Sequence, residues 1–198
     1  MARIIVLVGM MGSGKTTVGK RLAERLGVSF VDTDDLVAAE AGKSVREVFA
    51  SDGEAEFRRM ESQALHVALN SPDDLVVAAA GGCVLSANNR AAMHEHATCV
   101  LWLDADVATL GERTRRGAHR PLLDGDAATR LATLDGERRA LYESVADARI
   151  DTTCRTIHDV VNDVVGALGK AHTAWNEGAE FAYRTTTDHD IVRTIAEF

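Results

Sequence analysis

The stretch GMMGSGKTT at residues 9–17 limits the possible folds more than any other part of the sequence. Between Gly9 and Thr16 it matches GxxxxGK[ST], the phosphate-binding pattern called the P-loop. The run IIVLV at residues 4–8 precedes it and is typical of a buried strand, and the segment after it carries apolar residues at helical spacing. A P-loop requires a strand before it and a helix after it, so the sequence predicts a nucleotide-binding α/β protein.

Each residue type in this pattern has a part in holding phosphate. The glycines let backbone N–H groups converge on phosphate oxygens, and the N-terminus of the following helix favours an anion. The Lys15 ammonium group is expected to reach the β- and γ-phosphates, and the Thr16 hydroxyl is expected to bind Mg²⁺.

Strands and helices are predicted to alternate along the rest of the chain. Apolar, β-branched runs predict further strands over 29–34, 74–82, 98–104 and 148–152. Between them, helical patterns are expected over 34–42, 44–69, 86–95, 106–116, 127–146 and 156–169. The pattern over 44–69 fits one or two helices, with an apolar stripe formed by Phe57, Met60, Ala64 and Val67. This alternation predicts a parallel sheet covered by helices on both faces.

The bulk composition places the chain among small cytosolic proteins. Its 198 residues fit one domain, and its net charge of −8 argues against nucleic acid as a partner. The three cysteines form no CxxC pair, so reduced thiols are expected, and no segment is apolar and long enough for a membrane helix. Residues 1–169 are predicted to form one P-loop domain, and residues 170–198 are a C-terminal extension whose role and order the sequence leaves open.

The P-loop alone does not define a reaction, but other features narrow the choice. The chain has no Asn-Lys pair, which a guanine-binding NKxD signature requires, and it is too short for a motor ATPase. A short P-loop chain with a basic loop at 117–126 is typical of a small-molecule kinase.

Residues Asp32-Thr33-Asp34 end the second predicted strand. Side chains at i and i+2 of a strand point the same way, and the carboxyl ends of parallel strands border the ligand crevice. One carboxylate can then serve the metal and the other the acceptor hydroxyl. Alternatively, the acidic residues are a helix cap, with Asp34 or Asp35 as the capping residue.

Arginines and glycines suited to an anionic substrate follow along the chain. Arg58 and Glu61 lie one helical turn apart, which allows the carboxylate to hold the guanidinium for a ligand or makes an ordinary surface ion pair. Gly81 and Gly82 end the third predicted strand and permit close approach of a ligand. Arg120 lies in the loop, and a later helix offers Arg138 and Arg139.

Together, GMMGSGKTT, DTD, DGEAEFRRME, the glycine pair after a strand, RPLL and RRALY resemble the shikimate kinase family in order and spacing. The resemblance covers about residues 3–168. It implies a three-layer αβα P-loop fold with a five-stranded parallel sheet in the order 2-3-1-4-5. It also implies a helical substrate-binding region at about 33–61, and a mobile lid at about 114–125.

The resemblance also implies a role for each matching residue. Lys15, Asp34 and Arg120 would be catalytic, and Thr16 and Asp32 would hold Mg²⁺. Shikimate would bind Asp34, Arg58, Gly81, Gly82 and Arg138, with Glu61 bracing Arg58. ATP would bind Gly12, Ser13, Gly14, Lys15, Thr16, Thr17, Arg113, Arg120 and Arg155. The implied activity is phosphorylation of the 3-hydroxyl of shikimate in aromatic amino-acid biosynthesis, by a cytoplasmic enzyme expected to be a monomer unless the extension mediates self-association.

One position departs from the family and keeps alternatives open. The family usually has three glycines where this chain reads Ala80-Gly81-Gly82. The methyl group of Ala80 is either tolerated or reshapes the substrate floor, which favours another acceptor such as gluconate on the same fold. A non-catalytic ATP-binding regulatory protein is a third reading, but it gives no chemical reason for Lys15, Asp32, Asp34 and Arg120 together.

Overall fold

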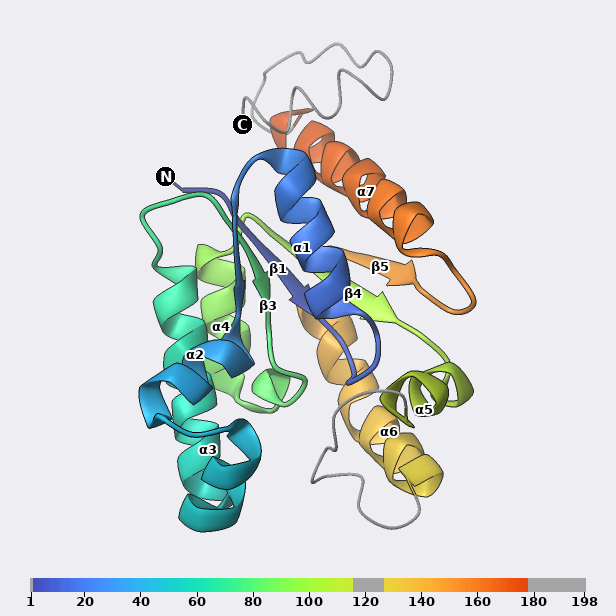
Figure 1. Ribbon diagram of the computed structural model, residues 1–198. Helices are drawn as coiled ribbons and strands as arrows, with labels where there is room; N and C mark the ends of the chain where they lie inside the picture. The colour runs from blue at the N-terminus through green and yellow to red at the C-terminus, as the bar shows by residue number, and fades with distance from the viewer. Residues whose placement is uncertain (1, 116–126, 178–198) are drawn as a thin grey trace.

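A computed structural model describes residues 2–115 and 127–177 of the chain (Figure 1). The predicted lid and Arg120 lie largely or wholly outside these ranges, as do residues 178–198. The strands are β1 (Ile4–Val8), β2 (Ser29–Asp32), β3 (Leu75–Ala78), β4 (Cys99–Asp104) and β5 (Ala148–Asp151). The helices are α1 (Lys15–Leu26), α2 (Thr33–Ala41), α3 (Val45–Leu69), α4 (Ala87–His96), α5 (Val107–Arg115), α6 (Ala127–Val145) and α7 (Ile157–Glu177), with a short 3₁₀ turn η1 (Cys83–Leu85).

The five strands form one parallel sheet in the order β2-β3-β1-β4-β5, which confirms the predicted architecture. The apolar run that becomes β1 lies in the middle, where each of its residues is buried. In the sheet register, Leu7 pairs with Ala78 of β3 and with Leu101 of β4. The loops that follow β1, β2 and β3 therefore leave the sheet at the same edge.

Helices cover both faces of the sheet, and each face has its own apolar core. On one face, α1 and α7 pack against the strands through residues such as Leu22 and Val164. On the other, α3, α4 and α6 pack around Leu65, Met93 and Tyr142 (Figure 1). This accounts for the continuous apolar strands, because a strand covered on both faces has no solvent side.

Two helices differ from their sequence predictions. Helix α3 runs through to Leu69 but is interrupted at Gly53, whose φ of 82° and ψ of 170° are not helical. Phe57, Met60 and Ala64 are buried as predicted, but the prediction for Val67 is wrong, since its side chain is 61% exposed. Leu65 and Ala68 face the core instead, because they continue the helical face of Ala64 toward the sheet. Helix α7 continues past residue 169 to Glu177, beyond the predicted domain boundary.

Within residues 2–115 and 127–177, no helix has the length and apolar character to span a membrane. The three cysteines are free thiols, as the sequence predicted.

Thiol titration of the native protein is expected to modify Cys154 alone. Burial raises the pKa of the Cys83 thiol and raises that of Cys99 to about 12, whereas Cys154 is exposed. A colorimetric thiol reagent should therefore react quickly with one equivalent in buffer and with three in denaturant. Rapid reaction of a second thiol in the native protein would contradict the burial of β4 or of η1.

Candidate active site

A pocket of about 800 Å³ lies at the carboxyl edge of the sheet. The P-loop, the start of α2 and the floor segment 79–82 contribute to its lining, together with side chains from α3, α5 and α6. Most residues that the sequence singled out meet here: Gly12, Ser13, Gly14, Lys15, Thr16, Thr17, Asp32, Asp34, Arg58, Gly81, Gly82, Arg113, Arg138 and Arg155.

The P-loop has the geometry of a phosphate cradle. Gly14 caps α1 with a φ of 98°, a left-handed conformation that a side chain disfavours. The Lys15 Nζ donates hydrogen bonds to the carbonyls of Gly9 at 2.8 Å and Met10 at 3.0 Å, so the ammonium group lies over the loop. Ser13 is 1% exposed: its backbone N–H donates a hydrogen bond of 3.2 Å to the Met10 carbonyl, and its Oγ has no hydrogen-bond partner among the described residues. A helix N-terminus lined by N–H groups and a cation suits a polyphosphate.

The two residues predicted to hold a metal ion contact each other. The Thr16 hydroxyl donates a hydrogen bond of 2.7 Å to Oδ2 of Asp32. In the described part of the chain, no group of three or more His, Cys, Asp or Glu side chains could hold a metal. A hydroxyl and a carboxylate beside a phosphate cradle do fit Mg²⁺, which takes oxygen ligands and completes its shell with water and nucleotide phosphate.

Asp34 lines the pocket by a different route from the one predicted. Strand β2 ends at Asp32, so strand alternation does not orient Asp34, which lies in the first turn of α2. The helix cap is Asp32, not Asp34 or Asp35: its Oδ1 accepts a hydrogen bond of 3.1 Å from the Asp34 backbone N–H. Because the helix starts directly after the strand, both carboxylates still reach the same pocket.

Arg58 and Glu61 form a partly buried ion pair where α3 lines the pocket. The Arg58 Nη1 lies 2.6 Å from Oε2 of Glu61, and Nη2 lies 3.2 Å from Oε1 of Glu54. Burial raises the pKa of Glu61 even against the attraction of Arg58, and the nearby Asp34 carboxylate raises it further. The Arg58 guanidinium is thus held by two carboxylates of the same helix, one from the turn before it and one from the turn after it.

Because Gly82 has no side chain, it leaves space for the Arg58 guanidinium. A Cβ on Gly82 would lie 2.8 Å from Cζ of Arg58 and closer still to Nη1, with Oε1 of Glu61 at 3.2 Å. The predicted close approach at this glycine is therefore made by the arginine that lines the pocket.

Helix α6 supplies a second guanidinium to the floor. Arg138 is 3% exposed, and its Nη1 donates a hydrogen bond of 3.2 Å to the Gly81 carbonyl. Its Nε is buried and has no hydrogen-bond partner within residues 2–115 and 127–177. The Tyr142 hydroxyl also donates to the Gly81 carbonyl, at 2.7 Å, so α6 holds this part of the floor at two points.

The neighbouring Arg139 has a structural role. Its guanidinium pairs with both carboxylate oxygens of Asp104 at 3.0 Å and lies 5.2 Å from the Trp102 ring centroid. The sequence offered Arg138 and Arg139 on this helix, and of these two only Arg138 lines the pocket.

On the opposite side of the pocket, Arg113 and Thr152 form the wall beside the P-loop. The Arg113 guanidinium donates to the Thr152 hydroxyl at 3.0 Å and to its carbonyl at 2.6 Å. Arg155 also lines this wall and pairs with Asp163 at 2.9 Å. The sequence did not single out Thr152, although its place directly after β5 was a usable signal, because carboxyl ends of parallel strands border the crevice.

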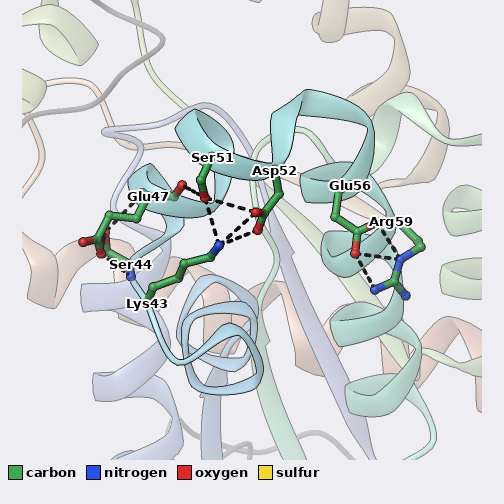
Figure 2. A network of polar contacts seen from close by, with 7 residues as sticks. All are labelled: Lys43, Ser44, Glu47, Ser51, Asp52, Glu56 and Arg59. Atoms are coloured by element: carbon green, nitrogen blue, oxygen red, sulfur yellow. Dashed lines mark hydrogen bonds and ion pairs between the residues drawn. The ribbon is translucent and has the colours of Figure 1, made fainter.

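A polar network fixes the first half of α3 to the loop before it (Figure 2). The Lys43 ammonium group bridges Ser51 at 2.8 Å and Asp52 at 2.9 Å, while Ser44 and Glu47 form a reciprocal capping box. The contacts of Lys43 end just before Gly53, where the helix is interrupted, and beyond it Figure 2 shows the separate pair of Glu56 and Arg59. The network thereby orients the turn that brings Ser44, Val45 and Arg46 to the pocket rim.

Comparison with known proteins gives consistent matches. The shikimate kinase family model matches residues 11–169. Shikimate kinase of Symbiobacterium thermophilum is 48% identical over 167 residues, which are 83% of this chain and 95% of the relative. Shikimate kinase of Mycobacterium ulcerans is 42% identical over 169 residues, covering 85% and 90%.

Solved structures show the same fold. The chain is similar to shikimate kinase from Acinetobacter baumannii in complex with shikimate, with a TM-score of 0.79 and 34% identity over 83% of this chain and 92% of that one. A gluconokinase from Sinorhizobium meliloti gives a TM-score of 0.60 at 20% identity, covering 88% and 97%, and this likeness extends to the fold alone.

Proposed function

The chain belongs to the shikimate kinase family, and on this premise we propose that it transfers the γ-phosphoryl group of ATP to the 3-hydroxyl of shikimate. The products are ADP and shikimate 3-phosphate. Membership makes the chain a phosphotransferase that uses ATP. Mg²⁺ as the metal and a monomeric state in the cytoplasm remain our predictions from the sequence.

The observation that supports an acceptor with a carboxylate is the buried guanidinium of Arg138. Its guanidinium is almost wholly buried, yet its Nε has no partner in the described part of the chain. A buried guanidinium that uses only part of its hydrogen-bonding capacity is costly, so an acceptor that brings a carboxylate to this pocket is favoured. Arg58 lines the same pocket, and two guanidinium groups suit the single carboxylate of shikimate.

The acceptor hydroxyl is assigned to Asp34 and the phosphates to the P-loop. Asp34 orients the 3-hydroxyl and takes its proton late in the transfer, because the transition state of phosphoryl transfer is loose. Lys15 neutralises charge that develops on the transferring phosphoryl group, and Arg113 and Arg155 border the nucleotide. We assign Arg120, which lies in the predicted lid outside the described residues, to neutralising the same developing charge.

Mg²⁺ would be held by Thr16 and, through water, by Asp32, and when bound it would shield the phosphate charge. The hydrogen bond between these two side chains keeps the hydroxyl and the carboxylate on one side of the cradle.

A coupled ADP-release assay tests the proposal, with ATP, Mg²⁺ and either shikimate, gluconate or no acceptor. We expect ADP release that depends on shikimate and that falls below detection in Asp34→Ala. Asp35→Ala is the matched control, since Asp35 is also acidic and in the first turn of α2 but does not line the pocket. Release stimulated by gluconate alone, or full activity of Asp34→Ala, would contradict the proposal.

A further inference from the structure

Thr33 lies between the two pocket carboxylates but faces away from solvent. Its side chain is 1% exposed, in contrast to those of Asp32 and Asp34, which line the pocket. The Thr33 Oγ1 accepts a hydrogen bond of 2.8 Å from the Ala80 backbone N–H and lies 3.4 Å from the Ala78 carbonyl. One hydroxyl thus bridges the end of β3 and the beginning of the pocket floor.

This bridge joins the two halves of the acceptor site. Thr33 is the first residue of α2, directly before Asp34, and Ala80 is directly before Gly81 and Gly82. At its other end, the floor is held by Tyr142 and Arg138 through the Gly81 carbonyl. The floor is therefore anchored on the Asp34 side by Thr33 and on the Arg138 side by α6.

We propose that Thr33 is a positioning residue for phosphoryl transfer, which sets the distance between Asp34 and the floor that carries the shikimate ring. The inference rests on the proposed function. Thr33 does not touch the substrate: its hydroxyl fixes the Ala80 peptide, and its backbone carries Asp34. If this bond is lost, Asp34 and the carboxylate-binding arginines can shift relative to each other, and a displacement of about 1 Å can lower a rate about a hundredfold.

The chemistry of the side chain permits a sharp test. Valine has nearly the shape of threonine but cannot accept the Ala80 N–H, whereas serine keeps the hydroxyl. Thr152 provides a matched comparison on the nucleotide side. It is also a buried threonine, 2% exposed, and its Oγ1 accepts from Arg113 at 3.0 Å.

The experiment measures kcat and the KM values for shikimate and ATP in wild type, Thr33→Val, Thr33→Ser and Thr152→Val. We expect Thr33→Val to lose about tenfold to a hundredfold in kcat/KM for shikimate, with KM for ATP within about twofold of wild type. Thr33→Ser should recover most of the loss. Thr152→Val should instead raise KM for ATP, because it releases the arginine beside the P-loop.

Amide hydrogen exchange and thermal unfolding accompany the kinetics. The Ala80 N–H should exchange faster in Thr33→Val than in wild type, because its acceptor is gone. Should Thr33→Val fail to fold, Thr33→Ala removes the same hydroxyl with less bulk and takes its place.

The outcomes separate the inference from the proposed function. Wild-type protein whose ADP release does not depend on shikimate would overturn both the inference and the proposed function. Active wild type with an unchanged Thr33→Val variant would overturn the inference alone. A Thr33→Ser variant as impaired as Thr33→Val would also overturn the inference, since it would indicate a packing effect and not positioning by the hydroxyl. The same holds if Thr33→Val changes kcat/KM for shikimate and for ATP equally, since this would indicate general destabilisation.

Discussion

Replacing Lys15 by alanine is expected to lower kcat by about a hundredfold to a thousandfold, the usual effect of removing one charge-stabilising group from an active site. The ammonium group lies over the P-loop within 3.0 Å of two of its carbonyls. A bound γ-phosphate would accept hydrogen bonds from the ammonium group in place of these carbonyls or together with them. Since the negative charge of phosphoryl transfer is spread over phosphate oxygens, its neutralisation acts mainly on the transition state. The ADP-release assay with saturating ATP and shikimate measures the loss directly.

The matched control for this prediction is Lys20→Ala. Lys20 is on the same helix, but it is exposed and its Nζ lies 5.8 Å from the Phe30 ring centroid, outside the pocket. We expect near wild-type kcat for this variant. Equal losses in both variants would mean that the effect comes from weakening α1, and an unchanged kcat in Lys15→Ala would argue against any phosphoryl transfer in this pocket.

The features that the sequence predicted best are those in which local pattern and chemistry agree. The P-loop was identifiable because its glycines, its lysine and its hydroxyl occur at fixed spacing between an apolar run and a helical pattern. The parallel sheet followed from strands that are apolar throughout, such as β1, since a strand that is buried on both faces shows no alternation. The strand order came from the family resemblance, because no local pattern encodes which strands are neighbours.

The errors arise where tertiary contacts decide between local alternatives. Strand alternation placed Asp32 and Asp34 on one face, but the helix begins one residue after Asp32, whose carboxylate caps it. Val67 fits an apolar stripe by spacing, but the sheet selects the adjacent face of α3.

Two further features of the site depend on which element packs opposite a residue. Local pattern does not distinguish Arg138 from Arg139, and the family resemblance alone selected Arg138. In the structure, Asp104 on β4 draws Arg139 away from the pocket. Thr33 gave no signal, because its partner at Ala80 is distant in sequence.

Ala80 shows how a departure from the family pattern is accommodated. It is buried, its backbone N–H is held by Thr33, and its φ does not lie in the left-handed region that favours glycine. Of the two floor glycines, it is Gly82 that has no room for a side chain, because Arg58 and Glu61 lie next to it, whereas a Cβ on Gly81 would meet its nearest atom at 3.4 Å. The substitution at residue 80 therefore leaves the arginine-binding part of the floor intact.

Replacing Gly82 by alanine is accordingly expected to raise KM for shikimate by roughly tenfold to a hundredfold while KM for ATP changes little. The new methyl group would overlap Nη1 of Arg58 and lie 2.8 Å from its Cζ, so the guanidinium must move out of the pocket wall. Losing a charge-assisted hydrogen bond to the substrate carboxylate costs about 1.5–3 kcal/mol, which gives this change in KM. Titration with shikimate in the ADP-release assay provides the measurement.

Gly136→Ala is the control, because a methyl group at this position of α6 meets no atom within 4 Å and alanine favours a helix. It should leave both KM values unchanged.

The pH dependence of stability gives a second check on Gly82→Ala. Burial already raises the pKa of Glu61, and displacing Arg58 weakens the stronger of the two cations, Arg58 and Arg138, that oppose this shift. When the pKa of a carboxyl is higher in the folded than in the unfolded protein, the folded protein loses stability as pH rises above the pKa of the unfolded state. The thermal stability of Gly82→Ala should therefore fall more steeply toward neutral pH than that of the wild type. A variant with normal KM for shikimate and a wild-type pH profile would show that Arg58 does not depend on Gly82 for its position.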